Sequence, residues 1–353
     1  MFGSLGLGPL ILIFAAAAGA IWLADIELSN TTDVLANRLH LGEALGGLIL
    51  LAIATNLPEI AITVSAALGH NLGIAIGNIL GGIAIQTAVL ALLDGFGVRR
   101  EPLMYRAASL VILLEAALVV AVLVIVIMGT RLSGSVVFLR TTPPELLIVA
   151  FWLAGLWLIA RARRGLPWHE AGNPPDGQAG PRGMAQGMKD EQRKEHSTVR
   201  VAGVFGAAAA VTLAAGVVLE ESGTEIAGHL GLSGVLFGAT VLAGATALPE
   251  ISTGLASLRL GDYQLAVSDI FGGNAFLPVL FLVATLISGE AVLPQAKSSD
   301  VYLTALGVLL TVVYIWSIVF RPQRQWGRLG PDSILVLVLY AVAIAALPAV
   351  APK

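Results

Sequence analysis

The chain has no cysteine among its 353 residues, which excludes disulfides, thiolate metal sites and cysteine nucleophiles. It is also poor in charge: Asp, Glu, Lys and Arg make up 12% of the residues, whereas a soluble domain carries about 25%. Hydrophobic residues make up 57%, and the mean hydropathy is +0.87. These residues fall in long runs, and a helix needs about 20 apolar residues to cross a bilayer. The composition therefore predicts an integral membrane protein.

Ten apolar segments predict ten transmembrane helices and an all-α integral membrane fold. Their limits are 5–24, 42–68, 72–93, 107–128, 144–160, 200–219, 232–258, 263–288, 300–320 and 333–350. The second and seventh segments are longer than one crossing requires, which predicts tilt or an interruption. The first segment lacks a basic leader and a small-residue cleavage site, so we expect a retained helix rather than a signal peptide.

A polar stretch divides the segments into two sets of five. Residues 161–199 are rich in Gly, Pro, Gln and charge, which predicts a solvated linker between a first half, 1–160, and a second half, 200–353. If the N-terminus lies outside, 16 of the 20 Lys and Arg residues fall in inner loops or the linker. Cytoplasmic loops carry such an excess. We therefore expect both termini outside, the 161–199 loop in the cytoplasm, and a multi-pass protein of a prokaryotic cell (plasma or inner) membrane.

An internal repeat is the most informative pattern in the chain. The stretch LAIATNLPEI at 51–60 returns as LAGATALPEI at 242–251, identical at eight of ten positions and offset by 191. The same offset aligns GNILGGIA at 77–84 with SDIFGGNA at 268–275. Five predicted spans separate the copies, so the second copy crosses in the opposite direction. Two inverted-topology five-helix repeats are typical of secondary transporters, whose ion sites lie near the membrane midplane.

Each copy of the motif places a carboxylate directly after a proline. Pro58 and Pro249 lack an N–H, so each frees a carbonyl inside a membrane helix. Such carbonyls are tolerated only where protein buries them or where they line a cavity. Glu59 and Glu250 follow, and a carboxylate in mid-membrane costs several kcal/mol unless it is paired. Because no Lys or Arg lies in an adjacent span, the expected partner is a bound cation or a proton.

A hydroxyl precedes each glutamate by four residues, on the same helical face: Thr55 before Glu59 and Thr246 before Glu250. Carboxylate, hydroxyl, carbonyl and amide oxygens form a hard site that suits Ca²⁺ or Na⁺ better than a soft metal. We expect inorganic cations and the lipid bilayer as partners, no nucleic acid and no resident cofactor. The sequence carries no signal for an oligomeric state.

The paired A-T-x-L-P-E and G-N/S-D-x-x-G-G segments resemble the α-repeats of the sodium/calcium exchanger (cation/Ca²⁺ antiporter) superfamily. The resemblance covers nearly the whole chain. It implies that Glu59 and Glu250 are the central cation-binding carboxylates and that Thr55 and Thr246 are flanking ligands. We expect discontinuous helices 2 and 7, and 3 and 8, around one central site.

The residues around the two glutamates depart from the family pattern. Family serines are replaced by Asn56 and Ala247, and the family's Asn or Asp is replaced by Gln86 and Leu277. The further candidate ligands are Asn56, Asn78, Gln86, Asp269 and Asn274. The four amides are either ligands or hydrogen-bonded links between helices. Asp269 is either a ligand or proton carrier or the cap of a broken helix.

Other polar and small residues have two readings as well. Glu115, alone in the fourth span, is either a proton carrier or a hydrogen-bonded acid. The glycines of the I-x-G-G segments either permit close helix approach or expose backbone carbonyls to the ion; they are Gly81, Gly82, Gly272 and Gly273.

The function that these residues predict is secondary antiport, in which Ca²⁺ or a related cation exchanges for Na⁺ or H⁺. The altered ligand shell favours H⁺, or fewer Na⁺ ions, as the counter-ion. The alternatives are an H⁺-coupled monovalent cation antiporter, a channel or scaffold, and an intramembrane serine protease that uses the G-x-S-G pattern at 231–234. A protease needs a histidine within a neighbouring span, whereas all five histidines fall in loops or at helix ends. We therefore expect a transporter and not an enzyme.

Overall fold

The computed structural model describes every residue except 1, 39–44, 99, 133–140, 168–196 and 351–353. Over the residues it describes, the chain is helical and contains no strand; Trp326 and Leu329 form an isolated bridge. The first half contains α1 (Leu7–Arg38), α2 (Leu45–Thr55), α3 (Leu57–Leu68), α4 (Leu72–Gly97), α5 (Leu103–Ala107), α6 (Leu110–Gly129) and α7 (Pro143–Ala162).

The second half is more finely divided than the first. It contains α9 (Thr198–Leu230), α10 (Gly234–Phe237), the π-helix η1 (Gly238–Leu242), α11 (Ala243–Thr246), α12 (Leu248–Arg259), α13 (Tyr263–Phe276), the 3-10 turn η2 (Leu277–Val279), α14 (Leu280–Ser288), the 3-10 turn η3 (Leu293–Gln295), α15 (Ser298–Phe320) and α16 (Pro331–Val350). Most of the linker predicted at 161–199 lies outside the described residues.

Nine helical segments of the described chain are long and apolar enough to cross a membrane. Ten spans were predicted, and the difference lies at 42–68. There α2 and α3 are separated by Asn56, so neither helix is long enough by itself. The corresponding segment of the second half, Gly234–Arg259, is interrupted as well but counts as one span.

Two predicted helix ends are wrong. α1 continues to Arg38 rather than ending at residue 24, and α9 continues to Leu230 rather than ending at residue 219. Hydropathy marks where side chains become polar, which is not where backbone hydrogen bonding stops. The polar part of α1 contains neither Gly nor Pro, and the Thr31 and Thr32 hydroxyls donate to helix carbonyls one turn earlier.

The offset of 191 that relates the motifs also relates the element boundaries. α1 begins at Leu7 and α9 at Thr198; α3 spans Leu57–Leu68 and α12 spans Leu248–Arg259. α4 and α13 begin at Leu72 and Tyr263, again 191 residues apart. The repeated sequence is therefore matched by repeated helix boundaries.

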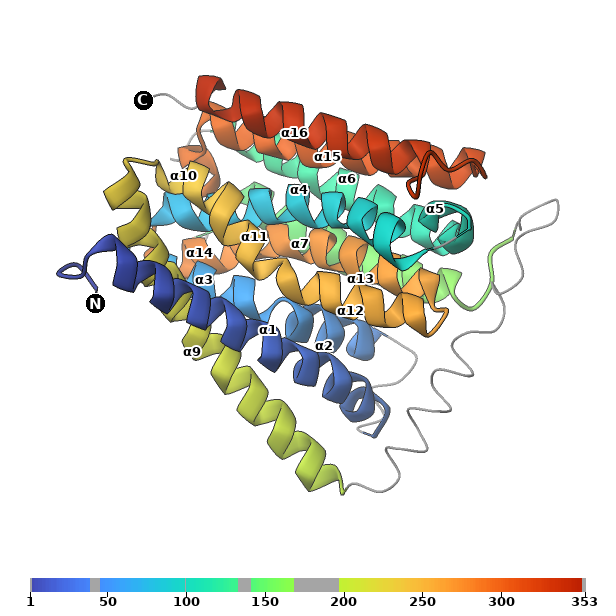
Figure 1. Ribbon diagram of the computed structural model, residues 1–353, viewed down its shortest axis with the longest axis horizontal. Helices are drawn as coiled ribbons and strands as arrows, with labels where there is room; N and C mark the ends of the chain where they lie inside the picture. Colours follow the sequence, from blue (N-terminus) through green and yellow to red (C-terminus); the bar gives the residue numbers. More distant parts are fainter. Residues whose placement is uncertain (1, 39–44, 99, 133–140, 168–196, 351–353) are drawn as a thin grey trace.

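The halves interleave rather than forming separate bodies. α4 lies at the centre, with 89% of its most apolar stretch buried, and packs against α15, α16, α12 and η1. α1 packs along α9, which is only 28% buried over the same kind of stretch. In Figure 1 these two helices lie on one side of the molecule and α15 and α16 on the opposite side.

Glycines allow the closest contact between the halves. A Cβ atom at Gly77 would lie 2.7 Å from the Val235 carbonyl oxygen, and one at Gly81 would overlap the backbone of Ala239. The reading of Gly81 as a site of close helix approach is therefore confirmed. Gly272, which occupies the matching position in the second copy, has nothing within 4 Å and does not serve this purpose.

The expected breaks in helices 3 and 8 are half right. α4 is continuous over 26 residues, so the third predicted helix is not discontinuous. Its counterpart is interrupted, because α13 gives way to the 3-10 turn η2 at Leu277. Pro278, which lacks an N–H, explains this interruption, and α4 contains no proline.

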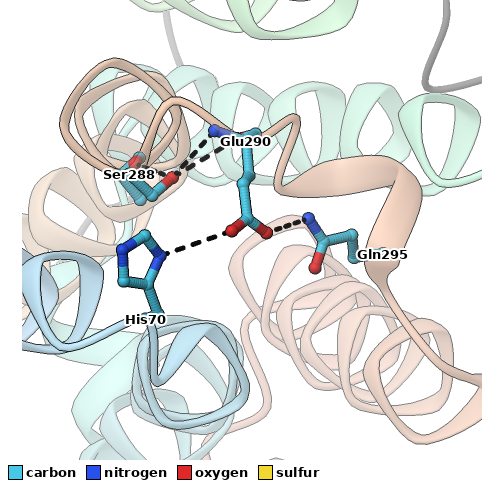
Figure 2. A network of polar contacts seen from close by, with 5 residues as sticks. His70, Ser288, Glu290 and Gln295 are labelled. Atoms are coloured by element: carbon cyan, nitrogen blue, oxygen red, sulfur yellow. Dashed lines mark hydrogen bonds and ion pairs between the residues drawn. The ribbon is translucent and has the colours of Figure 1, made fainter.

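A polar contact outside the core joins the two halves at one end of the bundle. Figure 2 shows His70, in the turn between α3 and α4, facing Glu290, in the segment after α14; His70 Nδ1 lies 3.3 Å from the carboxylate. The Gln295 amide donates to the other oxygen of Glu290 at 3.0 Å. Both members of the pair are exposed, so the contact is a surface one and contributes little to stability.

Candidate functional site

Two helix breaks place the glutamates inside the bundle. α2 ends at Thr55 and α3 begins at Leu57, while α11 ends at Thr246 and α12 begins at Leu248. Each break is followed by the proline, which cannot donate to the carbonyl four residues earlier. Each glutamate then lies in the first turn of its helix, where the positive end of the helix dipole favours a carboxylate.

The side-chain amide of Gln86, on α4, bridges the two glutamates. Its Nε2 donates to Glu250 Oε1 at 2.9 Å and to Glu59 Oε1 at 3.4 Å. Glu59 and Gln86 are almost fully buried. The second carboxylate oxygen of each glutamate has no hydrogen-bond partner among the described residues. Two carboxylates from separate motifs therefore meet at one amide, each with an oxygen to spare.

A small cavity opens on one side of this bridge. The volume of this cavity is about 10 Å³, close to the minimum that holds a single water molecule. Its lining residues are mostly acids, amides and hydroxyls: Asp25, Thr55, Asn56, Gln86, Glu250, Thr253, Asp269 and Gly273. None of these is basic. The cavity therefore suits a small hard cation or a water and has no counter-charge of its own.

The structure brings together most of the candidates named from the sequence. Thr55, Asn56, Gln86, Glu250 and Asp269 line the cavity. Glu59 adjoins it through Gln86, and the Thr246 hydroxyl lies beside the Glu59 carboxylate. The Asn56 amide donates to the Ala52 carbonyl at 2.8 Å, which leaves its oxygen available on the cavity side.

Two candidates lie away from the cavity. The Asn274 amide donates to Thr87 Oγ1 at 3.0 Å, as a link between α13 and α4. Asn78 is fully buried on α4, and neither of its amide atoms has a hydrogen-bond partner within the described part of the chain. The Asn274 nitrogen therefore links two helices, its oxygen has no hydrogen-bond partner among the described residues, and neither asparagine is part of the cavity lining.

Asp269 does not cap a helix. α13 is capped by Asp262, whose carboxylate accepts a hydrogen bond from the Leu265 N–H at 3.0 Å. Asp269 lies seven residues further on, in the middle of α13, and lines the cavity. The Thr253 hydroxyl lies 3.5 Å from Asp269 Oδ2. Of its two readings, the position of Asp269 favours the ligand or proton carrier.

Sequence reasoning missed two lining residues, Asp25 and Thr253. Asp25 lies one residue beyond the end assigned to the first helix, so it was not seen as an intramembrane acid. Thr253 was available from spacing, because it lies three residues after Glu250 on the same helical face. Gly273, which the I-x-G-G segment had singled out, also lines the cavity, and a Cβ atom added to it would lie 3.3 Å from Asn56 Oδ1.

In this conformation the acids lie close together but are not arranged as a complete metal-coordination site. Among the described residues, no group of three acidic, histidine or cysteine side chains is arranged to hold a metal ion. The Gln86 amide occupies one oxygen of each glutamate instead. Rotation of this one side chain would free both oxygens for a cation.

The remaining polar candidates belong to local structure. Ser233, the serine of the protease pattern, caps α10 by accepting a hydrogen bond from the Leu236 N–H at 3.2 Å. His229 contacts the Leu5 carbonyl instead of this serine. Glu115 is ion-paired with Arg163 at 3.1 Å and is not part of the cavity lining.

Comparison with known proteins places the chain in a family. The family described as "Sodium/calcium exchanger protein" matches residues 9–160 and 200–347, which leaves out the predicted linker. Inner membrane protein YrbG of Escherichia coli (strain K12) is 26% identical over 321 residues, covering 90% of this chain and 91% of YrbG. Putative antiporter CaxA of Alkalimonas amylolytica is 26% identical over 300 residues, covering 82% and 84%.

Solved structures share the fold at lower identity. The H⁺/Ca²⁺ exchanger CAX superposes with a TM-score of 0.66 at 14% identity, over 96% of this chain and 85% of that one. The sodium-calcium exchanger NCX_Mj superposes with a TM-score of 0.55 at 18% identity, over 97% and 99%. The family match covers most of the chain, and these structures have the same fold over nearly its whole length. The chain is a multi-pass membrane protein that belongs to the sodium/calcium exchanger family.

Proposed function

We propose that this protein is a secondary active antiporter that exchanges Ca²⁺, or a related cation, for Na⁺ or H⁺ through a site formed by Glu59 and Glu250. The observation that carries the proposal is the bridge at Gln86, because it brings the carboxylates of both motif copies to one point in the bundle. Glu250 lines a cavity that has no basic side chain in its lining, and Glu59 adjoins this cavity through Gln86. Two such acids require a cation or protons as partners.

Exchange follows from competition for these oxygens. A bound Ca²⁺ neutralises both glutamates, and so do two protons or two Na⁺ ions. With neither bound, two buried carboxylates would face each other unpaired, which is a costly state to move across the membrane. The carrier therefore changes its open side with one or the other kind of ion bound, and the two fluxes are coupled.

Alternating access fits a chain built from two inverted five-helix repeats. We take α2 and α3 together as the tenth crossing, since they fill the predicted second span. Ten crossings put both termini on one side, and in Figure 1 the start of α1 and the end of α16 lie at the same end of the bundle. The distribution of Lys and Arg supports an outside location for both and a cytoplasmic location for residues 161–199.

H⁺, or a reduced number of Na⁺ ions, is the proposed counter-ion. A multi-Na⁺ exchanger needs several oxygen-lined pockets beside the central pair. Leu277, at the position that matches Gln86, is fully buried and supplies no oxygen. A tenfold pH gradient supplies about 1.4 kcal/mol per proton, and 100 mV about 2.3 kcal/mol per net charge moved.

Uptake of ⁴⁵Ca²⁺ into proteoliposomes tests the proposal. We expect uptake to be driven by a pH gradient without Na⁺ and to change little when a K⁺/valinomycin potential is imposed, because one Ca²⁺ for two H⁺ moves no net charge. Strict Na⁺ dependence with strong voltage sensitivity would instead establish Na⁺/Ca²⁺ exchange with excess Na⁺. Proton flux that responds to Na⁺ or K⁺ but never to Ca²⁺ would replace the proposal with monovalent antiport.

A further inference from the structure

Asp25 is a buried acid for which neither motif copy accounts. It lies on α1, inside the Leu7–Thr32 span, and is 4% exposed. Its Oδ1 atom has no hydrogen-bond partner in the part of the chain that the structure describes. The side chain lines the same cavity as Glu250 and Asp269. An acid from a third region of the sequence therefore faces the candidate cation site.

A structural role does not explain this position. A carboxylate that stabilises a fold is paired with a basic group or with N–H donors, because an unpaired buried charge costs several kcal/mol. The charged groups that interact with Asp25 are Glu59, Asp269 and Glu250, all of the same sign. Two other polar residues of α1 are satisfied within their own helix: the Thr31 hydroxyl donates to the Glu27 carbonyl at 2.6 Å and the Thr32 hydroxyl to the Leu28 carbonyl at 2.7 Å.

A contact next to Asp25 holds α1 against the site. Trp22 lies three residues before Asp25, and its Nε1 donates to Ser252 Oγ on α12 at 2.6 Å. Ser252 follows Glu250 by two residues. Residues three apart lie on the same face of a helix, so this hydrogen bond fixes the face of α1 that carries Asp25 beside the Glu250 turn.

We propose that Asp25 is a further cation-binding carboxylate, so that the site is completed from α1 as well as from the two motif copies. The ligand is a hard cation of the class that the two glutamates take, with Ca²⁺ as the probe. The inference rests on the proposed function and adds to it: an acid on α1 makes cation affinity depend on where that helix lies. With α1 held against α12 through Trp22, the cation would contact Asp25 of α1, Glu59 of α3 and Glu250 of α12.

Two measurements separate a ligand from a structural residue: the Tm without Ca²⁺ and the Ca²⁺ concentration that is needed to raise the Tm. Thermal unfolding of the purified full-length protein in detergent is measured with increasing Ca²⁺ for the wild type, Asp25→Asn and Glu27→Gln. If Asp25 is a cation ligand, neighbouring acids repel its carboxylate in the cation-free protein. Removing its charge should then leave the stability of that protein unchanged or raise it. We expect Asp25→Asn to keep or raise the Tm without Ca²⁺ and to need about tenfold more Ca²⁺ for the same rise in Tm.

Glu27→Gln is the matched control, since it removes one acid from the same helix at an exposed position. It should respond to Ca²⁺ like the wild type. A lower Tm for Asp25→Asn together with an unchanged Ca²⁺ requirement would overturn the inference and make Asp25 structural, with the proposed function intact. A wild type that Ca²⁺ does not stabilise, and that transports no Ca²⁺, would overturn the proposed function and this inference with it.

Discussion

The two copies of the motif have the same backbone and different surroundings. Both break one residue before a Leu-Pro-Glu sequence, and α3 and α12 are each 12 residues long. At the break itself, the first copy has Asn56 and the second Ala247. On the neighbouring helix, the first copy supplies Gln86, whereas the second has Leu277 and an acid, Asp269.

This difference shows how a duplicated scaffold holds an asymmetric site. The repeat positions one carboxylate from each half, and a single amide, from the first half alone, spans them. Within the two motif copies, the extra acid, Asp269, comes from the second half. Changes at matching positions should therefore have equal effects at the glutamates and unequal effects everywhere else.

The largest effect is expected at the position that the copies share. Glu59→Gln or Glu250→Gln removes a charge that the cation needs and changes little volume, so exchange should fall by about 100-fold or more in each variant. Proteoliposome ⁴⁵Ca²⁺ uptake measures this, with Leu277→Met as a volume-conserving control at a buried position. Retained exchange in both variants would refute the two-glutamate site; retained exchange in one would show that the copies are not equivalent even here.

Gly81 and Gly272 provide a comparison of stability at matching positions. Gly81→Ala forces α4 away from the Ala239 backbone, which should destabilise the fold by about 1–3 kcal/mol. Gly272→Ala meets nothing within 4 Å and replaces a flexible residue in a helix, so it should be neutral or stabilise by up to about 1 kcal/mol. The Tm of each variant is measured by heating the protein in detergent and monitoring the loss of folded protein by size-exclusion chromatography. Equal decreases in Tm for the two variants would contradict the close contact between Gly81 on α4 and Ala239 on η1.

The smallest effect concerns the amide. Gln86→Leu gives the first copy the residue found in the second and removes the amide oxygen, which would contribute to the cation site once the Gln86 side chain rotates away from the two glutamates. We expect the Ca²⁺ affinity, measured by titration calorimetry, to fall about tenfold while the protein remains folded. Gln264→Leu makes the same substitution on α13, outside the cavity lining, and should leave the affinity unchanged. A Gln86→Leu affinity equal to that of the wild type would show that the Gln86 amide is not a ligand of the cation.

The repeat and its breaks could be predicted because they depend on local chemistry. Pro58 and Pro249 lack donors wherever they are placed, and the helices break next to them as expected. α4 is continuous because it contains no proline, and its glycines weaken the helix without removing a backbone hydrogen bond. The resemblance of the two α-repeat segments pointed to the family to which the chain belongs.

The rest depends on packing between segments far apart in the chain. Asp25 belongs to the cavity only because α1 docks on α12, which no feature of the first 40 residues indicates. Asn78 and Asn274 resemble Gln86 in chemistry, and only the positions of neighbouring helices decide that Gln86 lines the cavity whereas the two asparagines do not. The extra length of α1 and α9 was missed because polar helices look like loops in a hydropathy profile.

The packing of α1 on α9 also has a consequence for biosynthesis. Leu28 of α1 is buried against Ala208, and Val34 and Leu35 against Val201. α9 begins 191 residues after α1, and at a translation rate of about 5–20 residues per second it emerges roughly ten to forty seconds later. During that interval α1 lies in the bilayer without the helix that covers it. It has to remain inserted on its own apolar residues, with Asp25 already within the span, until the second half arrives.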